Sequence, residues 1–208
     1  MPAVVQDLLD SRPETRGLVV DVVHAEHRIP FDLRQGEPRN ADLAFVGRSD
    51  SHTVAVTVEA KADEPFGATV SDTMAAALQR WLTNERSGGL KRVLDLVDSV
   101  LPPSDAASAH AGAVRYQLLT AVAGTVAYAS ANQADVGVLI VHEFVTSRTR
   151  EPLHAKNDED YRAFMRRLGI TDLPSAASLA GPVTVPGGPL LKTPVPFFVG
   201  KVTTRVER

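Results

Sequence analysis

The clearest hydrophobic pattern in the chain lies between residues 41 and 61, where two runs of apolar residues flank a polar turn. The first run reads ADLAFVG, the turn reads RSDS, and the second run reads HTVAVTVEAK. β-Branched residues dominate the second run, and two such runs joined by a short polar turn are typical of a β-hairpin. We therefore predict an antiparallel hairpin over residues 41–61.

The segments before and after this hairpin show a mixture of helical and strand patterns. Apolar residues at helical spacing predict a helix over Pro2–Asp10, whereas the Val-rich run Gly17–Ala25 fits a helix or a strand equally well. After the hairpin we expect a helix capped by Ser71 or Asp72 that ends near Gly88-Gly89, then helices over Leu90–Leu101 and Ala109–Ala131.

The second half of the chain is predicted to add strands to the sheet. Val136–Val145 is apolar on both faces and reads as a central strand, and a last amphipathic helix is predicted to be capped by Asn157 or Asp158. Phe197–Val206 reads as an edge strand. The pattern predicts an α/β fold with a mixed central sheet flanked by helices, formed by one domain over residues 1–170 and followed by a Pro/Gly-rich extension over 171–208 that packs on it.

Composition and charge exclude several classes of protein. The 208 residues include no cysteine, so there is no disulfide framework and no thiolate zinc site. The acidic N-terminus does not resemble a signal peptide, which predicts a cytoplasmic protein. The apolar stretch 113–131 contains Arg115 and Gln117, which favours a buried helix over a membrane span. The net charge of −3 gives no global attraction to nucleic acid, and neither a P-loop, a GxGxxG motif nor a Ser-His-Asp arrangement is present.

Candidate chemistry is concentrated in the hairpin. Glu59 and Lys61 are two positions apart on the second strand and should share a face, and the turn brings Asp42 back beside Glu59. Two carboxylates, with the main-chain carbonyl of Ala60, are hard oxygen ligands suited to Mg²⁺ or Mn²⁺. An ion held there and the ammonium of Lys61 suit hydrolysis of a phosphodiester.

An Asp followed by Glu-x-Lys on the adjacent strand resembles the PD-(D/E)XK nuclease superfamily, and the resemblance covers residues 41–145. Asp42 matches the first acid, Glu59 the second and Lys61 the lysine, although the proline that often precedes the first acid is displaced to Pro38. The resemblance implies a restriction endonuclease-like core of a hairpin, a helix and a further strand, with Mg²⁺ or Mn²⁺ as cofactor, DNA as substrate and a homodimer. It also implies an acid from a first helix, a place for Glu26, and a polar group on the helix after the hairpin, a place for Gln117.

The strings VEAKADEPFG and VRYQLLTAVA are also similar to a bacterial family that carries V-E-x-K-x-D-E-P-F-G and R-Y-Q-L-L and has no assigned activity. We therefore expect a metal-dependent nuclease, and as the alternative a catalytically inactive nuclease-like module that binds protein or nucleic acid.

Each candidate also has an ordinary structural explanation. Lys61 and Glu59 fit a simple ion pair on an exposed face, and Asp63 and Glu64 fit a solvated strand end. Arg115 and Gln117 fit either a substrate contact or the polar edge of a helix. His142 and Glu143 fit the polar boundary of a strand, and the arginines of the hairpin region fit either phosphate contacts or an ordinary surface: Arg34, Arg39 and Arg48.

Overall fold

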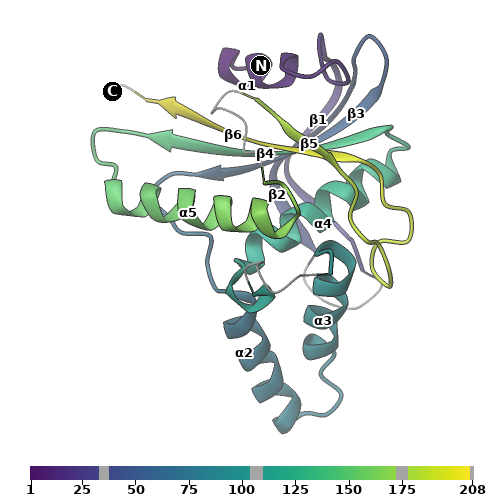
Figure 1. Ribbon diagram of the computed structural model, residues 1–208, viewed down its shortest axis with the longest axis vertical. Coiled ribbons are helices and arrows are strands. Elements are labelled where there is room, and N and C mark those ends of the chain that lie inside the picture. The colour runs from purple at the N-terminus through teal and green to yellow at the C-terminus, as the bar shows by residue number, and fades with distance from the viewer. Residues whose placement is uncertain (33–37, 104–109, 172–177, 207–208) are drawn as a thin grey trace.

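The protein is a single mixed β-sheet with helices on both faces (Figure 1). The computed structural model describes residues 1–32, 38–103, 110–171 and 178–206. The predicted α/β class is confirmed. The elements in chain order are α1 (Ala3–Asp10), β1 (Val19–Ile29), β2 (Arg39–Arg48), β3 (Thr53–Lys61), α2 (Val70–Thr83), α3 (Gly89–Val100), the 3₁₀ turn η1 (Ala111–Ala113), α4 (Tyr116–Ala131), β4 (Val136–Val145), α5 (Glu151–Arg167), β5 (Ala180–Val183) and β6 (Phe197–Arg205).

The sheet has the strand order β1-β2-β3-β4-β6-β5. The predicted hairpin is confirmed: β2 and β3 are antiparallel, with Leu43 opposite Val58, and β1 adds to β2 in the same sense. Strand β4 is parallel to β3, and β6 is parallel to β4. Parallel neighbours require crossover connections, here made by α2 to α4 and by α5. The carboxyl ends of β3, β4 and β6 therefore meet at one edge of the sheet, where Lys61 lies beside Glu143.

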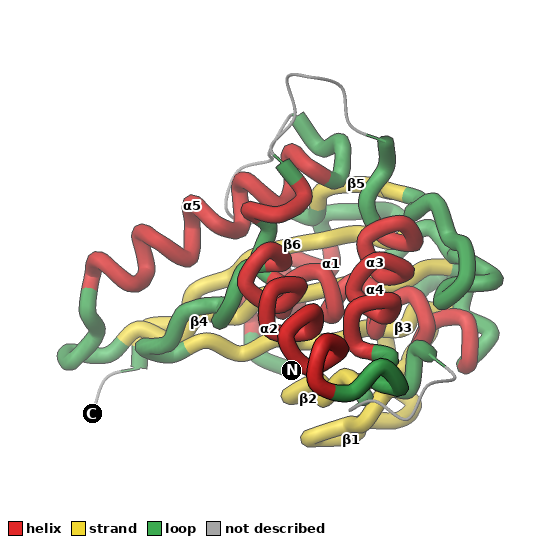
Figure 2. The backbone as a smooth tube through the Cα atoms, turned by 90° about the horizontal axis from the view of Figure 1, so that it is seen from below, coloured by secondary structure: helices red, strands yellow, loops and turns green. Residues whose placement is uncertain are grey.

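Each face of the sheet has its own core. Helix α1 packs Leu8 and Leu9 on one face with Phe45 and Val56, whereas α4 and α5 cover the other face (Figure 1). Seen from below, α2 and α3 lie in front of α4, which packs on the sheet, and α5 lies to one side of them (Figure 2). Helix α4 is buried over most of its length, as predicted for the apolar stretch 113–131. In the described part of the chain, no helix combines the length and apolarity needed to cross a membrane.

The helix boundaries differ from the prediction at four places. Helix α2 ends at Thr83 and not near Gly88-Gly89. Helix α2 is capped by Thr69 and not by Ser71 or Asp72, because Asp72 instead completes a capping box with the main chain of Thr69. The predicted helix 109–131 is interrupted before α4. Main-chain hydrogen bonds from Val70 to Val114 and from Tyr116 to Ala68 hold the chain extended there. Position 109 lies outside the described residues.

The last helix and the last strand also differ. Helix α5 begins at Glu151, well before the predicted caps Asn157 and Asp158, because a proline is well tolerated in a first turn. Strand β6 is not an edge strand: it lies between β4 and β5. The stretch after residue 170 therefore supplies two strands of the central sheet in addition to packing on it.

A candidate active site at the carboxyl end of strand β3

Strand β3 delivers Glu59 and Lys61 to the face covered by α4. Their side chains form an ion pair, with Lys61 Nζ 3.0 Å from Glu59 Oε1. Glu59 is 2% exposed and Lys61 3%, so the ordinary explanation of a pair on an exposed face is wrong. Val58, which directly precedes Glu59 on the strand, points to the opposite face and packs in the core beneath α1. Burying two charges is costly unless each is well paired, so the remaining partners of this pair matter.

Gln117 reaches the same carboxylate from the first turn of α4. Its Nε2 donates to Glu59 Oε1 at 2.5 Å, so this oxygen receives both the amide and the ammonium. Lys61 also donates to Glu64 Oε1 at 3.2 Å and lies 5.5 Å from the centre of the Phe66 ring. Glu64 is exposed, as expected of a solvated strand end, and its side chain also contacts the lysine.

Asp42 joins this motif through the main chain. Its Oδ2 accepts a hydrogen bond from the N–H of Ala60 at 2.6 Å, which ties β2 to the residue between Glu59 and Lys61. Asp42 also lines an apolar pocket of about 550 Å³ on the α1 side, together with Val58 and Ala60. The structure thus brings Asp42 to the backbone of the motif but does not place it in one pocket with Lys61 and Gln117.

Glu26 lies on β1 and not on a helix, which corrects the position expected from the resemblance. The pairing of Ala25 with Leu43 and of His27 with Ala41 sets Glu26 opposite Asp42. Its carboxylate is exposed and accepts a hydrogen bond from Asn40 at 2.5 Å. Its backbone is left-handed, with φ 49°, a conformation that is uncommon outside glycine.

A surface pocket of about 420 Å³ adjoins the Glu59 pair. It is lined by Lys61, by Gln117 of α4, by Thr73 of α2 and by residues 65–68. The D-E-P-F-G sequence that follows β3 therefore forms part of the pocket wall, through Glu64 and the residues after it. A ligand in this pocket would approach the lysine, the glutamine and, behind them, Glu59.

From the sequence, Arg39 was expected to be a phosphate contact or an ordinary surface residue, and its contact with Glu59 was not predicted. It begins β2, and its guanidinium contacts Glu59 Oε2. Burial lowers the pKa of Arg39 below its ordinary value, while the nearby charge of Asp42 acts in the opposite direction. The other flanking arginines do not join it: Arg48 is exposed and pairs with Asp21, and Arg34 lies outside the described residues.

A second buried acid lies on the neighbouring strand. Glu143, predicted only as a polar strand boundary, is 3% exposed, and its Oε2 lies 3.0 Å from Lys201 Nζ and 3.6 Å from His154 Nδ1. Asn157 on α5 donates to the main-chain oxygen of Glu64 at 2.9 Å. His142 faces the other side, where it shares a hydrogen bond with Thr204. The signal in the sequence was the polar pair that ends an otherwise apolar strand.

Arg115 takes a structural role at the start of α4. Its Nε donates to Asp160 at 2.8 Å and its Nη1 to the main-chain oxygen of Gly67 at 2.6 Å. It therefore connects α5, the D-E-P-F-G segment and α4. This arrangement favours the structural explanation of Arg115, whereas Gln117 points into the candidate site.

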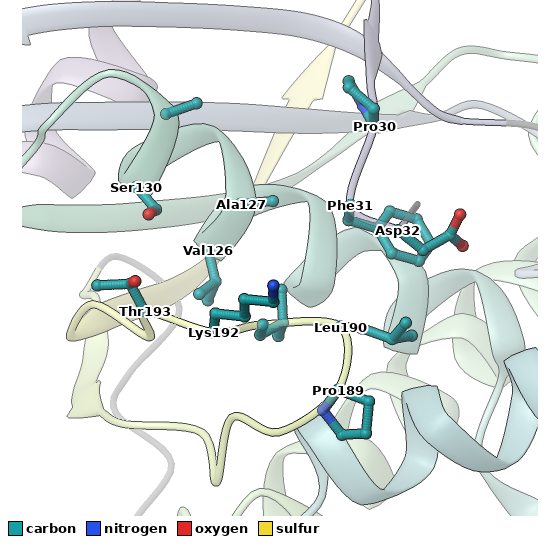
Figure 3. A pocket seen from close by; sticks show the side chains of 12 residues that line it. Pro30, Phe31, Asp32, Val126, Ala127, Ser130, Pro189, Leu190, Lys192 and Thr193 are labelled. Atoms are coloured by element: carbon teal, nitrogen blue, oxygen red, sulfur yellow. The ribbon is translucent and has the colours of Figure 1, made fainter. Parts of the chain in front are cut away.

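Another cavity, of about 400 Å³, lies apart from this site (Figure 3). It is formed by the C-terminal half of α4, the segment after β1 and residues 189–193. Val126 and Leu190 supply apolar wall, and the carboxylate of Asp32 is engaged by Arg92 at 2.5 Å. Val126 is nine residues along the helix from Gln117, a rise of about 13 Å, so the two cavities are distinct.

The oxygen donors at the end of β3 are of the type that hard divalent cations prefer, although Asp42 lines the pocket on the α1 side and Glu59 lies on the face of α4. Asp42 and Glu59 are carboxylates, and the Ala60 carbonyl belongs to the residue whose N–H Asp42 accepts. Among the residues that the structure describes, no group of three or more His, Asp or Glu side chains is arranged to hold a metal ion. Any ion would therefore depend on two carboxylates and a carbonyl, with Arg39 moved away from Glu59.

Fold and site together define an α/β protein with a buried Glu–Lys pair and a half-buried glutamine at the carboxyl end of a central strand. The chain belongs to the family described as "Domain of unknown function (DUF6946)", which matches residues 1–206. No curated protein and no solved structure matches the chain.

Proposed function

We propose that this protein is a metal-dependent phosphodiesterase of nuclease type that acts on nucleic acid, with DNA as the first candidate substrate. The observation that carries the proposal is the buried Glu59–Lys61 pair, held by the half-buried Gln117, beside a pocket. Buried charges that border a pocket are concentrated at functional sites, because burying them costs stability that packing alone does not recover.

The order of the elements supports the same proposal. A hairpin carries Asp42, Glu59 and Lys61, helices cross over the sheet, and β4 returns parallel to β3. This is the order that the resemblance to PD-(D/E)XK nucleases implies. Gln117 lies on α4, which follows the hairpin after α2 and α3; the resemblance expects a polar group on a helix after the hairpin.

Each residue has a proposed role. Asp42, Glu59 and the Ala60 carbonyl would hold Mg²⁺ or Mn²⁺. When bound, such an ion polarises a phosphoryl oxygen and lowers the pKa of water. The ammonium of Lys61 would orient the attacking water and stabilise developing negative charge. Gln117 positions Glu59 by its hydrogen bond. We give Glu26 no role, because its carboxylate is exposed and bonded to Asn40.

The net charge of the chain limits how the protein would bind nucleic acid. A net charge of −3 gives no general attraction to nucleic acid, so binding must depend on local groups around the pocket. We propose a cytoplasmic protein, with a homodimer as the assembly that the resemblance suggests.

A second candidate function is a nuclease-like module that binds nucleic acid or protein without cleaving it. Two observations favour it: Arg39 already neutralises Glu59, and Asp42 lines a pocket on the other side of β3. In such a module the ion pairs would serve stability alone. The two candidates differ in one measurable property, which is turnover.

The test is cleavage by the purified full chain of single- and double-stranded DNA and RNA, with Mg²⁺, with Mn²⁺ or with EDTA. We expect cleavage that EDTA abolishes and that Asp42→Asn and Lys61→Met reduce at least about 100-fold. The matched controls are Asp50→Asn in the hairpin turn and Lys192→Met at the distant cavity, both exposed and both expected to cleave normally.

Absence of cleavage on every substrate with both metals would overturn the nuclease proposal. Salt-dependent DNA binding under those same conditions would establish the second candidate instead. Equal loss of activity in the controls and in the site variants would show that the activity does not come from this site.

A further inference from the structure

Arg39 contacts one acid of the proposed metal site, Glu59, and its charge is near that of the other, Asp42. The guanidinium of Arg39 contacts Glu59 Oε2. Its side chain is only 12% exposed, so the contact is not a mobile surface pair. A cation of the protein itself thus neutralises the carboxylate that a metal ion would need.

A glycine in helix α4, Gly124, leaves space for the side chain of Arg39. A Cβ atom at Gly124 would lie 2.9 Å from Arg39 Cγ and 3.3 Å from its Cβ. Carbon atoms in ordinary contact are about 3.5–4.0 Å apart, so an alanine would displace the arginine stem. Glycine inside a helix costs about 1 kcal/mol relative to alanine. The close approach of Arg39 is the feature of the structure that this glycine makes possible.

Both oxygens of Glu59 are engaged in this arrangement. Lys61 and Gln117 hold Oε1, and Arg39 holds Oε2. A divalent cation must approach a carboxylate oxygen to about 2.0–2.1 Å for Mg²⁺. A guanidinium at the same oxygen blocks that approach and repels the ion, so the two cations exclude one another at Oε2.

We propose that Arg39 is a resident counter-ion of Glu59 that competes with the divalent cation and so sets the metal affinity of the site. The inference rests on the proposed function, because it presupposes that the site binds a metal ion. Arg39 is here a positioning residue: it holds the carboxylate in the metal-free protein and leaves it when the ion binds. Without Arg39, the buried carboxylate keeps one cation, Lys61, and attracts a metal ion more strongly.

The experiment measures binding of Mn²⁺ alone to the full chain, by calorimetry and by electron paramagnetic resonance of the free ion. We expect Arg39→Gln to bind Mn²⁺ at least about tenfold more tightly than the wild type, a change of about 1.4 kcal/mol. The matched control is Arg48→Gln on the same strand, whose exposed side chain pairs with Asp21 and whose affinity should stay within about twofold.

Gly124→Ala provides an independent test that leaves every charge in place. The added methyl group should push the arginine stem away from α4 and weaken its hold on Glu59, so Mn²⁺ affinity should rise, by less than in Arg39→Gln. Alanine favours helix more than glycine does, and circular dichroism checks that the variant is folded.

The outcomes separate this inference from the proposed function. Mn²⁺ binding to the wild type with equal or weaker binding to both variants would overturn the competition and leave the metal site standing. Absence of Mn²⁺ binding in the wild type and in every variant would overturn the proposed function, and the competition with it.

Discussion

Two buried glutamates on neighbouring strands make an instructive pair. Glu59 on β3 and Glu143 on β4 are 2% and 3% exposed, and both point to the face covered by α4 and α5. Each has a lysine 3.0 Å away, Lys61 for Glu59 and Lys201 for Glu143. By burial and charge alone the two acids are alike.

Their surroundings differ. The partners of Glu59 come from β2, β3 and α4, and two of them, Lys61 and Gln117, line a pocket. The partners of Glu143 come from β6 and from α5, where His154 lies 3.6 Å away. Burial alone therefore does not distinguish the two acids, and the contacts of Glu143 connect β4 to β6 and to α5. The pocket and the polar groups that line it make Glu59 the candidate.

The sharpest way to test this comparison is to neutralise each acid in turn. Glu59→Gln should lower metal-dependent cleavage at least about 100-fold, because it removes a metal ligand and the partner of Lys61. Glu143→Gln should retain cleavage within about threefold. Both variants should lose stability, Glu143→Gln by up to about 3 kcal/mol, because each removes one counter-charge of a largely buried lysine; Lys61 keeps Glu64 and Lys201 keeps Asp158. Cleavage assays and urea unfolding of the same preparations measure both properties.

The comparison fails if Glu143→Gln, while still folded by circular dichroism, loses as much activity as Glu59→Gln. It fails equally if Glu59→Gln cleaves normally. In the first case the two clusters would form a single site across β3 and β4.

A smaller effect is expected in the cluster that connects α5 to the sheet. This cluster contains Glu143, Lys201, His154 and Asp158, and acid should weaken it. Burial alone would raise the pKa of Asp158, but Arg162 and Lys201, which donate to its carboxylate, outweigh it and lower that pKa. The contribution of Asp158 to stability is therefore present above its ordinary pKa of about 3.9 and is lost as the pH falls through the lower pKa of the folded state.

We therefore expect the wild type to lose more unfolding free energy than Asp158→Asn between pH 5 and pH 3, by less than about 1 kcal/mol for this partly exposed group. Chemical unfolding at both pH values measures the difference, and Asp98→Asn on the exposed side of α3 is the control. Identical pH dependence of the wild type and Asp158→Asn would contradict the assigned pairing with Lys201.

The part of the fold that the sequence predicts is the part that local pattern determines. Alternation in the two runs around the RSDS turn predicts the hairpin, and the period of two places Glu59 and Lys61 on one face. The apolar run at β4 predicts a central strand, because only a strand covered on both faces needs such a run. Gln117 was placed near the site only through the resemblance, since helical periodicity alone does not say which helix end faces β3.

The rest depends on contacts between segments far apart in the chain. Arg39 reaches Glu59 because Gly124 leaves room for it, and no local pattern links these two positions. Lys201 meets Glu143 because β6 pairs with β4 inside the sheet, whereas its sequence suggested an edge strand. The start of α5 was missed because its first turn contains a proline and the polar residues Asn157 and Asp158 looked like caps.

The most direct test of the proposed site is to locate a bound ion. Crystals of the full chain soaked in Mn²⁺ and measured at the manganese absorption edge should show an anomalous peak bounded by the carboxylates of Asp42 and Glu59 and the carbonyl of Ala60, at about 2.0–2.6 Å from the ligand oxygens. Arg39 should have moved from Glu59 in the same map. A map with no peak there, and with Arg39 still on Glu59 at saturating Mn²⁺, would contradict the account.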